Sequence, residues 1–321
     1  MKTLLSIQSH VVHGYVGGKA AIFPLQCQGW DVDAINTVNF SNHTGYGCVK
    51  GSRLTRAELE DLFGGISDIN ITYDAVITGY VPNAELISVI NQYVGSLKLK
   101  QPNLMYLLDP VMGDQGYLYV DKSCIVQYRE SLASKIVDII TPNQFELELL
   151  YDGKISNLQD LKLAINYIHV TYGVKYVVVS SLTDLEGLDP DYIYCASSCV
   201  HSTDVQIFKI PIIKSYFTGV GDLFSALLLD KLSQNLQQKN EEDLALTRSV
   251  NQVLTIMSKT LKLTHSLAMK SLNKSLDSSL SQTTGKMNDR DSMKHFELQI
   301  IQSREFFNYN GEGDFSPTPI K

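Results

Sequence analysis

The chain has 321 residues, enough for one large α/β domain with a substantial core, and its net charge of −7 without a basic stripe excludes a typical nucleic-acid-binding protein. Five cysteines form no C-x-x-C pair, no apolar run is long enough to span a membrane, and the apolar run after Met1 is too short for a signal peptide. We therefore expect a reduced, soluble protein of the cytoplasm, with a nuclear location left open and with no nucleic-acid or membrane partner.

Short β-branched segments alternate along the chain with longer segments of helical periodicity. Strands are expected at 3–7, 31–36, 74–80, 104–110, 137–142 and 175–181. Helices are expected between them at 83–98, 122–133, 143–151 and 157–171. Several strands are apolar at consecutive positions, as strands buried on both faces should be. The alternation therefore predicts a mostly parallel sheet with helices on both sides.

Two further strands, 192–197 and 205–211, are expected to close the sheet as an antiparallel pair. A helix opening within "FTGVGDLFSALLL" (217–229) and a long helix at about 241–270 follow them.

The last fifty residues change in composition. We expect one α/β domain over 1–270, followed by a Ser-rich segment at 271–293 that is polar and therefore mobile. "KHFELQIIQSREFF" (294–307) returns to helical spacing and is expected to be a C-terminal helix of the same domain. Residues 308–321 are expected to be a frayed tail.

In an open parallel sheet, ligands bind beyond the carboxyl ends of the strands. Nearly every strand expected in this sheet is followed there by hydroxyl, amide or carboxylate side chains. These are Ser9, Thr78, Tyr80, Asp109, Asp114, Thr141, Asn143, Glu146, Ser180 and Ser181. The sequence therefore places most of its candidate chemistry at one edge of the sheet.

Several of these residues have a plainer structural explanation. "TPNQFE" (141–146) is also a helix start with Thr141 as N-cap, and Asp109 could simply end a strand. "NHTGYG" (42–47) could be an ordinary turn. Three histidines lack the spacing of metal ligands, which favours other roles for His10, His13 and His43.

The G-x-G-D string at 219–222 is weak evidence alone, because glycine and aspartate also open helices for local reasons. Its position before a helix suits an anion, since backbone N–H groups there point at a ligand and glycine allows close approach. A carboxylate beside an anion would repel it. Asp222 makes sense as a base that takes a proton from a hydroxyl attacking a phosphate.

Asp109 and Asp114 are suited to Mg²⁺ held partly through water and substrate phosphates. Together with the glycine turn they predict a phosphotransferase that works by positioning and charge stabilisation. The site is not a Walker P-loop. "HGYVGGKA" (13–20) has His13 where glycine is required and Ala20 where a metal-binding hydroxyl is required.

Six segments in series closely resemble the pyridoxal kinases, a branch of the ribokinase-like superfamily. They are "SIQSHVVHGYVGGKAAIFPLQ" (6–26), "NFSNHTGYG" (39–47), "TGY" (78–80), "DPVMGD" (109–114), "DIITPNQFELELL" (138–150) and "FTGVGDLFSALLL" (217–229). The resemblance runs from about Thr3 to Phe307 and weakens only in the Ser-rich segment.

The resemblance implies a three-layer α/β/α fold with a central, mostly parallel sheet and an antiparallel edge, assembled as a homodimer. The implied reaction is ATP-dependent phosphorylation of the 5'-hydroxymethyl group of pyridoxal, and also of pyridoxine and pyridoxamine, in vitamin B6 salvage. The implied ions are Mg²⁺, in some members Zn²⁺, and K⁺ or another monovalent cation.

Residue by residue, the resemblance implies that Asp222 is the base. The anion hole would be formed by the amides of Gly219, Val220 and Gly221. The vitamer would be held by Ser9, Val16, Phe40, His43, Thr44, Tyr80 and Asp222. ATP would be held by Asp109, Asn143, Glu146, Ser180, Ser181, Ile213, Ser215, Gly219 and Gly221. The metal would be held by Asp109, Asp114, Thr141 and Glu146.

Three departures from the family pattern stand out. Val220 occupies a position where many relatives have Ala or Thr, so a side-chain hydroxyl contact to phosphate is absent there. Neighbouring Thr218 could replace it, depending on where its hydroxyl points. The loop after Asp114 is shorter than in some relatives, and 271–293 has no counterpart in the pattern.

Three other functions stay open from sequence alone. A hydroxymethylpyrimidine kinase of the same superfamily often carries Cys in place of the base, so Asp222 argues against it. A sugar kinase of the ribokinase branch would place a "GG" motif differently after its first strand. A non-catalytic pyridoxal 5'-phosphate carrier would be expected to lose Asp222, the glycines or Asp109, and none is lost.

Overall fold

The computed structural model describes residues 1–183, 185–202, 204–238, 241–272 and 285–320. Their largest feature is a ten-stranded sheet in the order β12-β11-β10-β9-β8-β5-β4-β1-β2-β3. Its parallel centre consists of β1 (Lys2–Val11), β2 (Trp30–Phe40), β4 (Ala75–Thr78), β5 (Met105–Leu108), β8 (Ile139–Ile140) and β9 (Tyr176–Leu182). The antiparallel edges are β10 (Tyr192–Cys199), β11 (Gln206–Pro211) and β12 (Thr318–Pro319) on one side and β3 (Gly51–Arg53) on the other.

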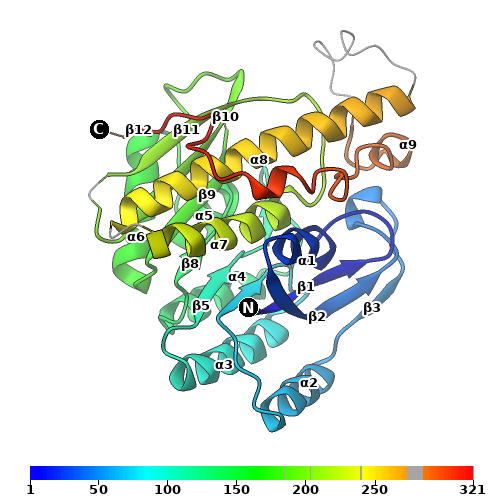
Figure 1. Cartoon of the computed structure of the whole chain (residues 1–321), viewed down its shortest axis with the longest axis vertical. Coiled ribbons are helices and arrows are strands. Elements are labelled where there is room, and N and C mark those ends of the chain that lie inside the picture. The colour runs from blue at the N-terminus through cyan, green and yellow to red at the C-terminus, as the bar shows by residue number, and fades with distance from the viewer. Residues whose placement is uncertain (184, 203, 239–240, 273–284, 321) are drawn as a thin grey trace.

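Helices cover both faces of this sheet (Figure 1). One face is packed against α1 (Gly18–Cys27), α7 (Val220–Gln238) and α8 (Glu242–Ser271). The other face is packed against α2 (Arg56–Asp68), α3 (Ala84–Lys100), α4 (Ser123–Ala133), α5 (Gln144–Tyr151) and α6 (Leu158–Tyr172). The predicted three-layer α/β/α fold with an antiparallel edge is confirmed.

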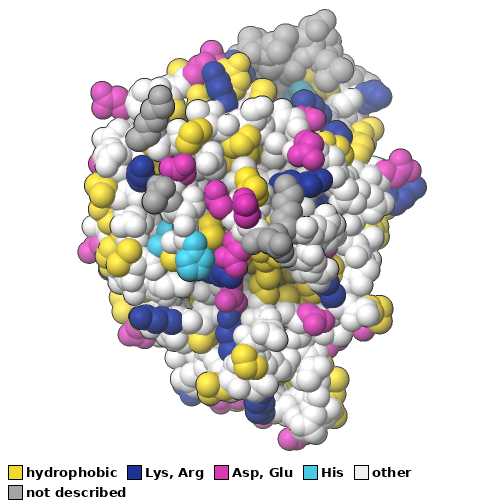
Figure 2. Space-filling view, turned by 60° about the vertical axis from the view of Figure 1, so that its left-hand side comes forward, with side chains coloured by type: hydrophobic (Ala, Val, Ile, Leu, Met, Phe, Trp, Pro, Cys, Tyr) yellow, Lys and Arg dark blue, Asp and Glu magenta, His cyan; other side chains and the backbone are white. Residues whose placement is uncertain are grey.

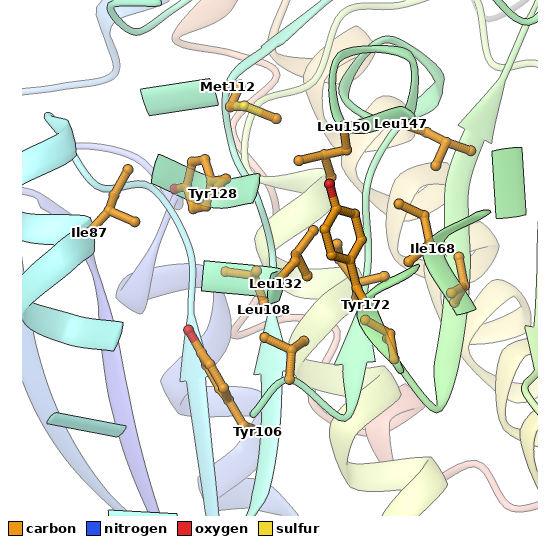
Figure 3. Packing of buried hydrophobic residues seen from close by; sticks show 14 of the residues in the cluster. Ile87, Tyr106, Leu108, Met112, Tyr128, Leu132, Leu147, Leu150, Ile168 and Tyr172 are labelled. Atoms are coloured by element: carbon orange, nitrogen blue, oxygen red, sulfur yellow. The ribbon is translucent and has the colours of Figure 1, made fainter. Parts of the chain in front are cut away.

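The consecutive apolar residues of the central strands divide between two cores. Leu108 and Ile140 belong to the core beneath α2–α6, whereas Leu107 and Ile139 belong to the core beneath α1, α7 and α8. This follows from the alternation of side chains along a strand. Figure 3 shows the first core, where aromatic and aliphatic side chains of α4, α5 and α6 meet those of β5.

The helices α1 and α2 were not predicted from the sequence. α2 buries only Leu59 and Phe63, because few of its residues are apolar. Its capping box, in which Thr55 and Glu58 bond each other's backbone, was the sequence signature that could have predicted it. α1 begins directly after Gly17 and contains Pro24. Glycine and proline are typical of loops, so the sequence of this segment does not look helical.

The predicted helix at 294–307 is wrong. The segment consists of turns that end in a short 3₁₀ turn, η3 (Phe306–Asn308), and it follows α9 (Arg290–Met293). Phe296 and Leu298 are buried in two different apolar clusters, and Glu297 between them is hydrogen-bonded to Tyr15 and Tyr46, so contacts with distant parts of the chain fix this backbone. The backbone N–H of Gln299 bonds the Thr264 hydroxyl of α8 instead of a helical carbonyl.

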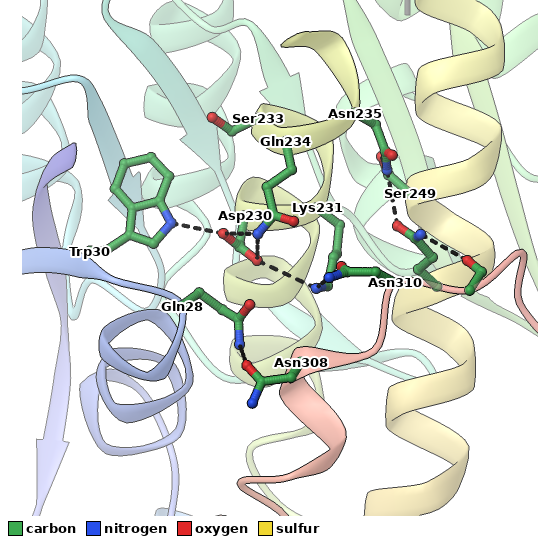
Figure 4. A network of polar contacts seen from close by, with 12 residues as sticks. Gln28, Trp30, Asp230, Lys231, Ser233, Gln234, Asn235, Ser249, Asn308 and Asn310 are labelled. Atoms are coloured by element: carbon green, nitrogen blue, oxygen red, sulfur yellow. Dashed lines mark hydrogen bonds and ion pairs between the residues drawn. The ribbon is translucent and has the colours of Figure 1, made fainter. Parts of the chain in front are cut away.

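The predicted frayed tail is also wrong, because the chain after Asn308 is hydrogen-bonded across α7 and α8. Figure 4 shows Asn310 accepting a bond from the buried Lys231 ammonium at 3.0 Å and Asn308 accepting one from Gln28. Further along, β12 pairs with β11, and Ile320 is 5% exposed. Polar side chains of α7 and α8 thus form hydrogen bonds with this tail.

The predicted mobile segment at 271–293 is wrong for its last part, and 273–284 lie outside the described residues. Gly285 packs closely against Ser215 and Tyr216, and the N–H of Asn288 donates to the carbonyl of Gly45. Met293 is 3% exposed. This end of the segment therefore belongs to the folded domain.

On the face shown in Figure 2, acidic and basic side chains are interspersed, with hydrophobic side chains in small groups. Across the described ranges, no helix combines the length and the apolar character needed to cross a membrane.

Candidate active site

The glycine turn predicted as an anion site lies directly at the start of α7. Gly219 has a φ of +76°, and a Cβ placed on it would lie 1.9 Å from the carbonyl oxygen of Tyr15. Only glycine fits there. Gly221 is different, because a Cβ on it would have just one neighbour within 4 Å, the Oδ2 of Asp109 at 3.8 Å. The helix start therefore faces open space beside Asp109, which suits a bound anion.

Asp222 lies in the first turn of α7, where the backbone N–H of Gly17 stabilises its charged carboxylate. Burial raises the pKa of Asp222, and the Gly17 N–H partly opposes that rise. A carboxylate with a raised pKa beside an anion site is a competent proton acceptor.

Asp109 follows β5, and its carboxylate is buried, with the residue 5% exposed. Burial raises its pKa most, followed by the charges of Glu146 and Asp222. The hydroxyl of Ser225 opposes them by donating to Oδ2 of Asp109 at 3.1 Å. The same hydroxyl bonds that of Thr141 at 2.8 Å. Ser225 was missed from the sequence, although its place three residues after Asp222 puts both on one side of α7.

Helix α5 (Gln144–Tyr151) begins one residue after the expected start at 143. Asn143, not Thr141, is its N-cap, and Glu146 closes the capping box. Glu146 also reaches across to accept the N–H of Met112 at 2.9 Å, while the Asn143 amide donates to the carbonyl of Gly113 at 2.7 Å. These bonds attach α5 to the small hairpin of β6 (Gly113–Asp114) and β7 (Tyr117–Leu118).

The four predicted metal-site residues do not form a ready-made metal cluster. Over the described ranges, no group of three or more His, Cys, Asp or Glu side chains is placed to hold a metal ion by itself. The donor set nevertheless consists of oxygen atoms, as Mg²⁺ prefers. Burial raises the pKa of Glu146 most, and the charge of Asp114 raises it further, just as the charge of Glu146 adds to the effect of burial on Asp109. A divalent cation completed by phosphate and water would relieve this repulsion, so the residues fit Mg²⁺.

Three side chains predicted to contact the vitamer form one small apolar cluster. Val16 and Phe40 pack with Val11 and Val38, and Tyr80 covers them. This cluster is separate from the two cores of the sheet. It supplies the apolar wall that a flat aromatic ligand needs.

Three other residues predicted to contact the vitamer are polar. Ser9 is buried against Gly17, where a Cβ would lie 2.3 Å from the Ser9 hydroxyl. His43 accepts the N–H of Gly45 through Nδ1 at 3.0 Å, and burial lowers the pKa of His43 to about 4. The ring is therefore neutral at physiological pH. Thr44 is exposed at the start of the 3₁₀ turn η1 (Thr44–Tyr46).

A cavity of about 980 Å³ opens beside the β6–β7 hairpin, and Asp114, Ser181 and Ile212 are among the residues that line it. Ser180 donates to the carbonyl of Pro142. Ser215, predicted to contact ATP, instead accepts the N–H of Gly285 at 3.2 Å through its hydroxyl. Of the predicted nucleotide residues, Ser181 therefore lines this cavity, whereas Ser215 lies four residues before the glycine turn at 219–221.

Glu297, like Ser225, is a residue of the site that was not predicted from the sequence. It lies in the segment wrongly expected to be a helix, is 6% exposed, and receives the hydroxyl of Thr218 at 3.4 Å. The Thr218 hydroxyl thus points to Glu297. No local sequence pattern could have placed this carboxylate in the site, because it arrives through a tertiary contact.

Comparisons with known proteins agree with this geometry. A family model described as phosphomethylpyrimidine kinase matches residues 32–269. A pyridoxal kinase of Ovis aries is 38% identical over 271 residues, 81% of this chain and 85% of that protein. A pyridoxal kinase of Arabidopsis thaliana is 40% identical over 254 residues, 74% of this chain and 77% of that protein.

Solved structures give the same answer. The structure of pyridoxal kinase from Leishmania donovani in complex with ADP and pyridoxine matches with a TM-score of 0.82 and 30% identity, and the match covers 99% of each chain. The chain therefore belongs to the pyridoxal kinase family of the ribokinase-like superfamily.

Proposed function

We propose that this protein transfers the γ-phosphoryl group of ATP to the 5'-hydroxymethyl group of pyridoxal, and also of pyridoxine and pyridoxamine, in vitamin B6 salvage. One observation carries the proposal. Asp222 stands at an open helix start, and its charge is stabilised by the backbone N–H of Gly17, which directly follows Val16 of the apolar cluster. A base, an anion site and a wall for an aromatic ring thus meet at one point.

The pyridine ring would lie against Val16, Phe40 and Tyr80, which are the apolar members of the pocket. Ser9, Thr44 and the neutral ring of His43 would supply hydrogen bonds to the ring substituents. A partner left without its hydroxyl would be a buried unsatisfied group, so these contacts select the vitamer.

Asp222 would take the proton of the 5'-hydroxyl as its oxygen attacks the γ-phosphorus of ATP. The bond from that phosphorus to the bridging oxygen breaks, and ADP leaves. The amides of Gly219, Val220 and Gly221 would stabilise the charge on the transferred group, because they are fixed before it arrives. Thr218 takes no part in this contact while its hydroxyl is bonded to Glu297.

The ATP phosphates would extend from the anion loop at 218–221 toward the β6–β7 hairpin, past Asp109, Asn143 and Glu146. Ser180 and Ser181 would lie on the nucleotide side, with Ile213 and Ser215 at the base of the loop. The pyridoxal kinase of Leishmania donovani is solved with ADP and pyridoxine, which supports two adjacent binding sites in this fold.

Mg²⁺, or Zn²⁺, would be held by Asp109, Asp114 and Glu146, with Thr141 behind them. A divalent ion supplies charge that neutralises the phosphates. A monovalent cation such as K⁺, a homodimer and a cytoplasmic location complete the proposal, and they rest on the family resemblance.

A second candidate, phosphorylation of hydroxymethylpyrimidine, is favoured by the description of the matching family model. The decisive experiment measures ADP release from MgATP with each acceptor alone. Turnover with pyridoxal that disappears in Asp222→Asn supports the proposal, whereas turnover with only hydroxymethylpyrimidine would replace it by the second candidate.

A further inference from the structure

Glu297 is a buried carboxylate that connects three separate parts of the chain. Its Oε2 accepts the backbone N–H of Tyr15 at 2.9 Å and the hydroxyl of Thr218 at 3.4 Å. Its Oε1 accepts the phenol of Tyr46 at 2.8 Å. Burial and this bond raise the pKa of Tyr46, so the phenol remains a donor.

Each partner lies beside a different element of the site. Tyr15 precedes Val16 and lies two residues before Gly17, whose N–H stabilises the charge of Asp222. Thr218 directly precedes the glycine turn at 219–221. Tyr46 ends the turn that begins at Thr44.

The packing around Glu297 leaves little room for movement. A Cβ on Gly14, whose φ is +91°, would lie 2.4 to 2.6 Å from the Glu297 carboxylate group. The neighbouring Tyr15 carbonyl in turn lies so close to Gly219 that no side chain fits there. A shift of Glu297 would therefore move the loop at 14–17 and the loop at 218–221 together.

We propose that Glu297 is a positioning residue that holds the vitamer loop at 14–17 against the anion loop at 218–221 and so sets where Asp222 meets the acceptor hydroxyl. The inference rests on the proposed function. Glu297 touches neither substrate in this arrangement and acts through Tyr15, Tyr46 and Thr218.

Two substitutions separate positioning by hydrogen bonds from simple filling of space. Glu297→Gln keeps an acceptor for Tyr15 and Thr218, and its amide can donate to the Tyr46 oxygen. Glu297→Leu has a similar volume and no polar atoms. We expect Glu297→Gln to keep kcat within about threefold of wild type and Glu297→Leu to lose at least about tenfold, since small misplacements of reacting groups cost up to about 10²-fold.

The measurement is kcat with pyridoxal and MgATP at saturation, on protein shown to be folded by circular dichroism well below its Tm. Glu305→Leu, at an exposed glutamate of the same segment, is the control and should match wild type. A purely structural Glu297 would lower Tm but leave kcat per folded enzyme unchanged. A folded Glu297→Leu that loses less than tenfold overturns the inference, and so does a folded Glu297→Gln that loses as much as Glu297→Leu.

If Glu297→Leu does not fold, Tyr46→Phe decides, because it removes only the phenol oxygen that meets Oε1. A loss of kcat of threefold or more supports positioning, and a smaller loss overturns it. Wild type without any pyridoxal kinase activity would instead refute the proposed function, so the two failures are distinguishable.

Discussion

The backbone N–H of Gly17 lies close enough to the carboxylate of Asp222 to stabilise its charge and oppose the rise in its pKa that burial causes. Gly17 is the N-cap of α1 and has a φ of +54°, and a Cβ on it would lie 2.2 Å from the Ser9 carbonyl oxygen. The base is therefore attached to the vitamer side of the site although it belongs to the helix on the phosphate side. This contact joins acceptor recognition to proton removal.

Replacing the base tests its assigned role. We expect Asp222→Asn to fold as well as wild type, because it removes a carboxylate whose raised pKa shows that its charge is poorly solvated. Its kcat should fall by about 10²–10⁴-fold, the usual effect of losing a positioned base. Asp243→Asn is the control, since burial also raises the pKa of Asp243 outside the site. Equal kcat values for the two variants would remove Asp222 from the mechanism.

The two glycines of the turn should fail for different reasons. Gly219→Ala is expected to lower both Tm and kcat, because its methyl group would overlap the Tyr15 carbonyl in a left-handed conformation. Gly221→Ala meets no such overlap and should keep its Tm. Its methyl group would occupy the anion's space, costing on the order of 10²–10³-fold in kcat, as loss of one oxyanion donor does. Thermal unfolding and ADP release check both, and an active Gly221→Ala would show that the anion binds elsewhere.

Acid should destabilise the loop that carries His43. Burial lowers the pKa of His43 from 6.5 to about 4, so the unfolded chain binds a proton more readily than the folded one. The stability from the neutral ring is complete above about pH 6.5 and is lost as the pH falls toward 4. His43→Asn keeps an acceptor for the Gly45 N–H and does not titrate. The wild-type advantage in urea unfolding should therefore shrink between pH 7 and pH 4.5, and a constant difference would contradict the assignment.

The packed tail predicts unequal effects for two asparagines. Asn310 accepts a bond from Lys231, which is fully buried, whereas the exposed Asn308 accepts one from the half-buried Gln28. We expect Asn310→Ala to cost about 1–3 kcal/mol of unfolding free energy, because it removes the hydrogen bond of a buried ammonium and leaves it only the Asp230 carboxylate at 3.8 Å. Asn308→Ala should cost less than about 0.5 kcal/mol, as surface changes usually do. Urea unfolding measures both, and equal costs would mean that the tail is loosely held.

The sheet and most candidate residues could be predicted from the sequence because the information is local. Consecutive apolar residues such as Leu107 and Leu108 identify strands buried on both faces, and polar residues directly after them must lie at one edge. Val16, Phe40 and Tyr80 also meet in one cluster, as the resemblance implied.

What could not be predicted depends on tertiary contacts. "TPNQFE" contains two overlapping caps, and the bond of Thr141 to Ser225 of α7 leaves the cap to Asn143. Glu297 meets Tyr15 across 282 residues of sequence, and no pattern near either residue records that pairing. The apolar residues around Glu297 have helical spacing in the sequence, but the backbone there is not helical and is hydrogen-bonded to α8.

The most direct test of the account compares kcat/KM for pyridoxal, hydroxymethylpyrimidine and ribose by ADP release under identical MgATP conditions. The apolar wall of Val16, Phe40 and Tyr80 suits a flat ring and leaves the hydroxyls of a sugar without partners. The account predicts a value for pyridoxal at least ~10²-fold above either competitor, the scale of such mismatches. A comparable value for either competitor, or no ADP release with pyridoxal, would contradict it.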